Sequence, residues 1–78
     1  MLLKEVHEMM PLAMAKPGEI NKIVKISGKD ETKRFLNNLG FVEGAEVSIV
    51  SVLGGNMIVH IRDGRVALDG DLARRIMV

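Results

Sequence analysis

The stretch 45–68, AEVSIVSVLGGNMIVHIRDGRVAL, decides the fold class of this sequence. It holds three apolar runs, and two turn signals separate them: Gly54-Gly55-Asn56 and Asp63-Gly64. Runs rich in β-branched residues are typical of strands, and an aspartate–glycine pair between two such runs is a strong hairpin signal. We therefore expect three antiparallel strands, over 45–53, 57–62 and 65–68.

The first of these runs changes phase partway along. Ala45, Val47 and Ile49 share one face of a strand, whereas Val50 and Val52 have the other parity. Because side chains alternate across a strand, a slip of one residue turns them over. A β-bulge near Ile49-Val50 would direct both halves at one core and bend the strand, as a small barrel requires.

A two-residue loop at Asp63-Gly64 would fix the register of the second hairpin, with Arg62 opposite Arg65. The inner face would then consist of Val59, Ile61, Val66 and Leu68, and the outer face of His60, Arg62, Arg65 and Ala67. Like charges directly opposite each other are unfavourable for folding. We therefore interpret Arg62 and Arg65 as candidates for contact with an acidic partner, against the alternative that they are simply solvated.

Ile20–Ser27 and Asp30–Leu39 precede these strands. The first segment is rich in Ile and Val and lies between two glycines, which favours a strand over a helix. The second is the one helix expected inside the domain. Ser27 or Asp30 can cap its first turn, and the acidic residues there face the positive end of the helix dipole.

The end of this helix has a recognisable termination signal. Gly40 lies where a residue of positive φ is needed, so that Phe41 can fold back onto Leu36 in a Schellman motif. Phe35 and Leu39 complete an apolar stripe with Leu36. We assign all four apolar side chains to the core.

The ends of the chain add short elements. Pro11–Ala15 can place Leu12 and Met14 on one face. After the second hairpin, 69–73 is one helical turn at most, and 75–78 can add a last short strand. Turn formation and capping account for three aspartates near this end: Asp63, Asp69 and Asp71.

This order of elements contains too many short strands and too little helix for an α/β sheet. A small, strongly bent antiparallel barrel hides the edges that an open sheet leaves unpaired, and we expect it to span residues 10–78. Residues 1–9 form an N-terminal extension with apolar residues at roughly helical spacing. They are either a frayed tail or a short helix that covers the domain or a partner.

The composition of the chain excludes several classes of function. The 78 residues make one small domain, with 11 Lys+Arg against 10 Asp+Glu and a net charge of +1, which is too balanced for a dedicated nucleic-acid binder. The chain has no Trp or Tyr to stack on single-stranded nucleic acid. It has no Cys, so disulfides and thiolate metal sites are excluded and a reducing cytoplasmic location is favoured. No apolar run is long enough to span a membrane.

Catalytic motifs are also missing, and the sequence predicts a protein that is not an enzyme. His7 and His60 share no ligand spacing. His60 is the one candidate metal ligand, and it competes with a solvated strand histidine because the neighbouring arginines would repel a cation. On the helix, the side chains of Lys33, Arg34, Asn37 and Asn38 form a polar face. This face is either solvated surface or, at Lys33, Arg34 and Asn37, a second candidate binding site.

Several segments resemble the FeoA family, the ferrous iron transport protein A domain. The likeness covers about residues 10–78, beginning with PLAMAKPGE at 11–19. Its most specific segment is 39–47, LGFVEGAEV, a leucine–glycine step followed by a short apolar link, a glycine and a strand. The turn at 54–56, the strand at 58–62 and the closing Ile76-Met77-Val78 follow the same pattern. Many members have proline where this sequence has Glu43.

The resemblance implies an SH3-like barrel with an inserted helix, similar in fold to the C-terminal domain of iron-dependent repressors. It implies a small cytoplasmic accessory or regulatory protein that binds the cytosolic part of FeoB, the membrane ferrous iron transporter. It implies no catalytic residues, no resident cofactor, no nucleic acid and no membrane insertion, with a monomer or a weak homo-oligomer as the assembly. The alternatives are a regulator-associated domain like that of the repressors, and a weak transition metal ion binder for Fe²⁺.

Overall fold

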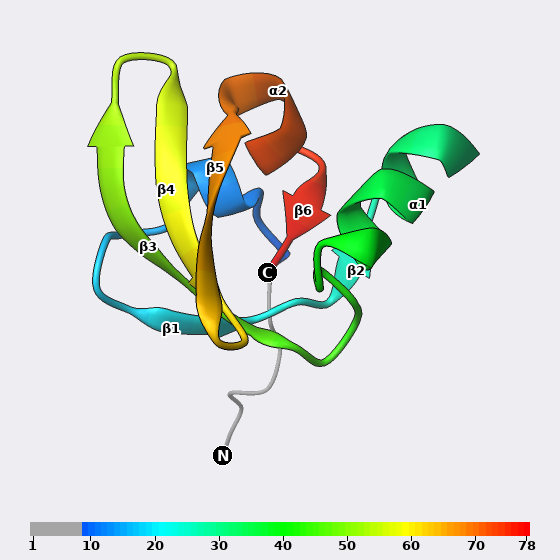
Figure 1. Cartoon of the computed structure of the whole chain (residues 1–78), viewed down its shortest axis with the longest axis horizontal. Helices are drawn as coiled ribbons and strands as arrows, with labels where there is room; N and C mark the ends of the chain where they lie inside the picture. The colour runs from blue at the N-terminus through cyan, green and yellow to red at the C-terminus, as the bar shows by residue number, and fades with distance from the viewer. Residues whose placement is uncertain (1–8) are drawn as a thin grey trace.

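The computed structural model describes residues 9–78, which form two small antiparallel sheets and three short helical segments (Figure 1). The larger sheet has the strand order β1-β3-β4-β5, with β1 at Ile20–Lys22, β3 at Glu46–Leu53, β4 at Asn56–Ile61 and β5 at Gly64–Asp69. The smaller sheet pairs β2, Lys25–Ile26, with β6, Ile76–Met77. The helical segments are the 3-10 helix η1, Leu12–Met14, and the helices α1, Asp30–Asn38, and α2, Gly70–Ala73. The chain is therefore mainly β, as predicted. The N-terminal extension, interpreted as either a frayed tail or a short helix, lies outside the described residues except for Met9.

The strand predicted over 20–27 is divided between the two sheets. The N–H of Ile23 donates to the carbonyl of Ala45 at 2.9 Å, and the N–H of Val24 donates to that of Met77 at 2.8 Å. The backbone thus leaves the larger sheet and joins the smaller one between consecutive residues. This crossing explains why the apolar alternation of the segment is imperfect.

The bulge predicted in β3 is present. The register against β4 shifts between Ile49, which pairs with Val59, and Ser51, which pairs with Ile58. The consequence drawn for the core was wrong, because Val50 and Val52 are exposed and Leu53 is 64% exposed. The end of the β3–β4 hairpin extends beyond the core, on the opposite side of the molecule from α1 (Figure 1).

The register of the β4–β5 hairpin differs from the prediction by two residues. Ile61 pairs with Gly64 and His60 pairs with Arg65, so the turn residues are Arg62 and Asp63. Because side chains alternate with a period of two, this shift leaves the predicted inner and outer faces unchanged. The pairing of Arg62 with Arg65 was wrong. In the observed register buried Met57, and not Val59, lies opposite buried Leu68.

Helix α1 ends as predicted. Gly40 has a φ of 106°, its N–H donates to the carbonyl of Asn37 at 3.0 Å, and the N–H of Phe41 donates to that of Leu36 at 3.0 Å. These are the two hydrogen bonds of a Schellman motif. At the other end the predicted caps were wrong, because Lys29 is the N-cap residue and no side chain caps the helix.

Only part of the predicted apolar stripe of α1 is buried. Leu36 and Phe41 are fully buried, but Phe35 is 51% exposed and Leu39 is 36% exposed. Assigning these two residues to the core was therefore wrong. With nine residues, α1 is short, and Leu36 is the one residue between its ends that is buried.

The core lies between the two sheets and is closed by the ends of the described chain. Met10 and Val78 exchange two backbone hydrogen bonds, of 3.0 and 2.8 Å, and Pro11 pairs with Met77. In η1, Leu12 is fully buried whereas Met14 is 71% exposed, so the two do not share a face as expected. The largest fully buried side chains are Phe41, Leu12, Leu36, Ile49, Leu68, Ile76, Val47 and Val59.

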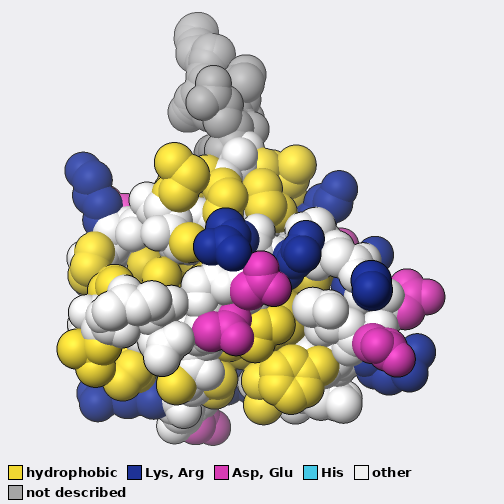
Figure 2. Space-filling model, turned by 90° about the horizontal axis from the view of Figure 1, so that it is seen from above, with side chains coloured by type: hydrophobic (Ala, Val, Ile, Leu, Met, Phe, Trp, Pro, Cys, Tyr) yellow, Lys and Arg dark blue, Asp and Glu magenta, His cyan; other side chains and the backbone are white. Residues whose placement is uncertain are grey.

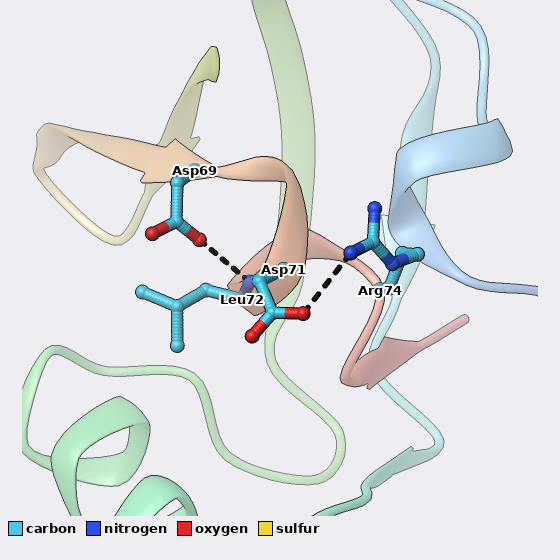
Figure 3. A network of polar contacts seen from close by, with 4 residues as sticks. All are labelled: Asp69, Asp71, Leu72 and Arg74. Atoms are coloured by element: carbon cyan, nitrogen blue, oxygen red, sulfur yellow. Dashed lines mark hydrogen bonds and ion pairs between the residues drawn. The ribbon is translucent and has the colours of Figure 1, made fainter. Parts of the chain in front are cut away.

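The aspartates near the C-terminal end have structural tasks (Figure 3). Asp69 is the N-cap of α2, and its Oδ1 accepts a hydrogen bond from the N–H of Leu72 at 2.8 Å. Asp71 pairs with Arg74 at 3.0 Å, with both side chains largely exposed. Cap formation accounts for Asp69 as predicted, and it fixes the start of the turn that leads into β6.

Candidate partner-binding surface

Arg62 lies over the C-terminal end of α1. A Cβ atom built on Gly40 would approach the Cδ and Nε of Arg62 at 3.2 Å and the Cγ1 of Ile61 at 3.6 Å. The last turn of α1 has no basic residue of its own. Arg62 therefore brings a positive charge from the β4–β5 turn to the negative end of the helix dipole, where it is favourable.

The backbone of Arg62 is held in an uncommon conformation. Its φ is 55°, and it is the one non-glycine residue of positive φ among residues 9–78. Such a conformation costs about 1–3 kcal/mol and persists only where the surroundings impose it. Here the pairing of Ile61 with Gly64 imposes it, because the two strands must be joined by only two residues.

A hollow of about 640 Å³ opens beside Arg62 on the outer face of the larger sheet. Its floor follows the cross-strand pairs of Ser48 with Ile20 on one side and with His60 on the other. Its lining includes two carboxylates, Glu43 and Glu46, and one arginine, Arg62. The lining residues are Ile20, Val42, Glu43, Gly44, Ala45, Glu46, Val47, Ser48, His60 and Arg62.

A second hollow, of about 440 Å³, lies between this region and α1. It is lined by Ile26, Lys33, Asn37, Val42 and Glu43. Val42 and Glu43 therefore separate the two hollows and belong to both. We call the surface formed by Lys33, Asn37, Val42, Glu43, His60 and Arg62 the link face.

The structure separates the residues that the sequence proposed for partner binding into two groups. Lys33, Asn37 and Arg62 line the link face. Arg34 is exposed on α1 but lines neither hollow. Arg65 lies on β5, where it pairs with His60 of β4, and it also lies outside both hollows.

Sequence reasoning missed the exposed apolar pair on α1. Phe35 and Leu39 are four residues apart, so they are neighbours on the helix surface. Hydrophobic side chains are visible on the surface in the view from above (Figure 2). The spacing of the apolar residues indicates that they share a side of the helix. It does not indicate how much of that side is buried against the sheets.

Metal-ligating groups are sparse in the described part of the chain. Within residues 9–78, no three or more His, Cys, Asp or Glu side chains gather closely enough to hold a metal ion. His60 is exposed between Ser48 and Arg65 in the cross-strand row. Among the same residues, no helix has the length and apolar character needed to cross a membrane.

The family model described as "FeoA domain" matches residues 10–78. The chain belongs to the FeoA family. The match begins at Met10, whose backbone is hydrogen-bonded to that of Val78. It therefore covers both sheets and all three helical segments. No curated protein matches the sequence.

Solved structures place this FeoA family member among SH3-like folds. A crystal structure of an iron uptake regulatory protein, FeoA, is 26% identical with a TM-score of 0.83, covering 91% of this chain and 96% of that one. A FeoA from Stenotrophomonas maltophilia in complex with zinc, described as a prokaryotic SH3 domain protein, is 29% identical with a TM-score of 0.74, covering 86% of each chain. The FeoA family assignment and the SH3-like fold are thereby confirmed.

Part of a metal-dependent repressor has the same fold. A manganese-dependent transcriptional repressor is 19% identical with a TM-score of 0.82, and the match covers 90% of this chain but 40% of the repressor. At this identity the likeness concerns the fold alone. It agrees with the predicted similarity to a domain of such repressors.

Proposed function

We propose that this FeoA family member is a non-enzymatic accessory or regulatory protein of ferrous iron transport. It acts in the cytoplasm by binding the cytosolic part of a FeoB-type membrane transporter. The observation that carries the proposal is the family match over residues 10–78. The Stenotrophomonas maltophilia neighbour, which is named as a possible activating factor of bacterial ferrous iron transport, supports the same direction.

The link face is the surface that we propose for this contact. It combines two hollows on either side of Glu43 with cationic side chains at both ends, Lys33 on α1 and Arg62 in the β4–β5 turn. A partner whose surface carries charges of the opposite sign at matching positions would be attracted to this surface and oriented by it. Arg62 is already held in a costly backbone conformation, so little further ordering is required of its backbone on binding.

A pull-down from detergent-solubilised bacterial membranes tests the proposal. The full chain with an affinity tag should retain the ferrous iron transporter, identified by mass spectrometry. Lys33→Ser should reduce the amount retained. Arg34→Ser removes one positive charge from the adjacent position outside the hollows and should leave the amount unchanged. A transporter absent from the retained proteins would contradict the proposal.

A regulator-associated role is the second candidate, because the manganese-dependent repressor shares the fold. An electrophoretic mobility shift with plasmid DNA at low salt distinguishes it from the first. We expect no shift, since the net charge of the chain is only +1. Direct carriage of Fe²⁺ is tested separately by anaerobic titration calorimetry, in which we expect little heat because no ligand cluster is present among residues 9–78.

A further inference from the structure

Strand β5 forms one edge of the larger sheet. The pair Ile61–Gly64 closes the two-residue turn, and such a closing pair is hydrogen-bonded. Bonded and non-bonded pairs alternate along an antiparallel ladder. Gly64, Val66 and Leu68 therefore bond to β4. The backbone groups of the intervening residues, Arg65, Ala67 and Asp69, point away from it.

The β3–β4 hairpin gives the same alternation independently of the β4–β5 hairpin. Its turn is closed by the pair Leu53–Asn56, so the even-numbered residues of β4 bond to β3. The odd-numbered residues of β4 are then left to bond to β5. Both hairpins thus agree on which groups of β5 face the sheet and which face outward.

The outward backbone groups of β5 are open within the described chain. Among residues 9–78, no backbone hydrogen bond outside the ladder involves Arg65, Ala67 or Asp69. All three residues are exposed. A row of free N–H and C=O groups on an edge strand is a template for the addition of another strand.

The charges along this edge favour one partner and one register. Arg65 and Asp69 have opposite signs and lie on the same face of β5 as Ala67, which is midway between them. Antiparallel pairing of two copies centred on Ala67 places Arg65 of each copy opposite Asp69 of the other. Registers centred on Arg65 or on Asp69 would instead place like charges opposite each other, which is unfavourable.

We propose that two copies of this chain pair antiparallel through β5, with Ala67 on the two-fold axis. The contact is isologous and closes on itself, as a two-fold interface requires. Asp69 can serve both its cap and the contact, because only its Oδ1 accepts from the N–H of Leu72. One added strand buries little surface, so the dimer belongs to the weak class with less than about 1,200 Å² buried.

A charge exchange between two variants of the full chain tests the register. Arg65→Asp leaves only acidic residues at positions 65 and 69, and Asp69→Arg leaves only basic ones, so each variant alone should stay monomeric in sedimentation equilibrium. An equimolar mixture should associate, because both contacts are then attractive again. Asp69→Asn keeps the cap of α2 and removes only the charge. It should weaken association of the chain with itself without lowering its melting temperature.

Amide hydrogen exchange of the unmodified chain gives a second readout that needs no variant. The amides of Arg65, Ala67 and Asp69 should exchange fast in dilute protein and slow down as the concentration rises. The amides of Val66 and Leu68 should be protected throughout. A chain that stays monomeric up to the highest soluble concentration would overturn the proposal, and so would a mixture of the two charge variants that fails to associate. These tests use the chain alone and do not depend on its transport role.

Discussion

Gly40 lies beneath Arg62 at the end of α1, and its backbone φ of 106° makes it hard to replace. Gly40→Val would place a β-branched side chain at a φ of 106° and 3.2 Å from Arg62. We expect a loss of about 1–3 kcal/mol in unfolding free energy. Each kcal/mol lowers Tm by roughly 4–8 °C in a domain of this size. Gly64→Val is the control, because Gly64 is a strand residue without positive φ or a nearby atom. An unchanged Tm for Gly40→Val would refute the strain at this position.

Arg62 itself offers a second test at the same scale. Arg62→Val removes the Cδ and Nε that lie over Gly40 and places a β-branched residue at positive φ, and we expect it to destabilise the fold by about 1–3 kcal/mol. Arg62→Gly loses the contact over Gly40 and gains backbone relief, so the two effects offset each other and stability changes by less than about 1 kcal/mol. Urea denaturation measures both. Equal losses for the two variants would show that the backbone conformation costs nothing.

At the scale of elements, the β3–β4 hairpin has an anchored half and a projecting half. Ile49, before the bulge, is buried, and Leu53, after it, is 64% exposed. Ile49→Ala should cost about 2–5 kcal/mol because it leaves a cavity in the core. Leu53→Ala should change stability by less than about 0.5 kcal/mol. Thermal denaturation of the two variants compares them, and a large loss for Leu53→Ala would place the hairpin end in the core.

The elements also show what local patterns can and cannot predict. The Schellman ending of α1 and the bulge in β3 follow from local chemistry, and both were predictable from Gly40 and from the phase change at Val50. The register of the β4–β5 hairpin depends on packing against the rest of the core, so Asp63-Gly64 did not determine it. The exposure of Phe35 depends on how α1 rests on the sheets, which no spacing within nine residues encodes.

The candidate site was only partly predictable for a related reason. Lys33, Asn37 and Arg62 were identified as polar residues on outward faces. Their common surface arises because the link at Val42–Glu43 passes between α1 and the hairpin turn. Arg34 and Arg65 were grouped with these residues because of their charge. The fold places both outside the two hollows, and a pattern of charges in the sequence does not predict that separation.

At the scale of the whole molecule, the two proposed contacts use different residues. The link face contains none of the three outward residues of β5, and Arg65 belongs to the edge strand. The two proposed contacts therefore share no residue, although His60 of the link face pairs with Arg65 across the ladder. Self-association and transporter binding can consequently be tested by separate variants of one chain.

Binding of the full chain to the purified cytosolic domain of a FeoB-type transporter tests the central claim most directly. Association rates should be measured at low and high ionic strength for the unmodified chain, for the double variant Lys33→Ser with Arg62→Gly, and for Arg34→Ser as the control. Charged contacts of this kind act mainly on the association rate and are screened by salt. We expect the double variant to associate several-fold more slowly at low salt, with the difference shrinking at high salt and the control unchanged. Equal association rates for all three proteins, or no binding of the unmodified chain, would contradict the account.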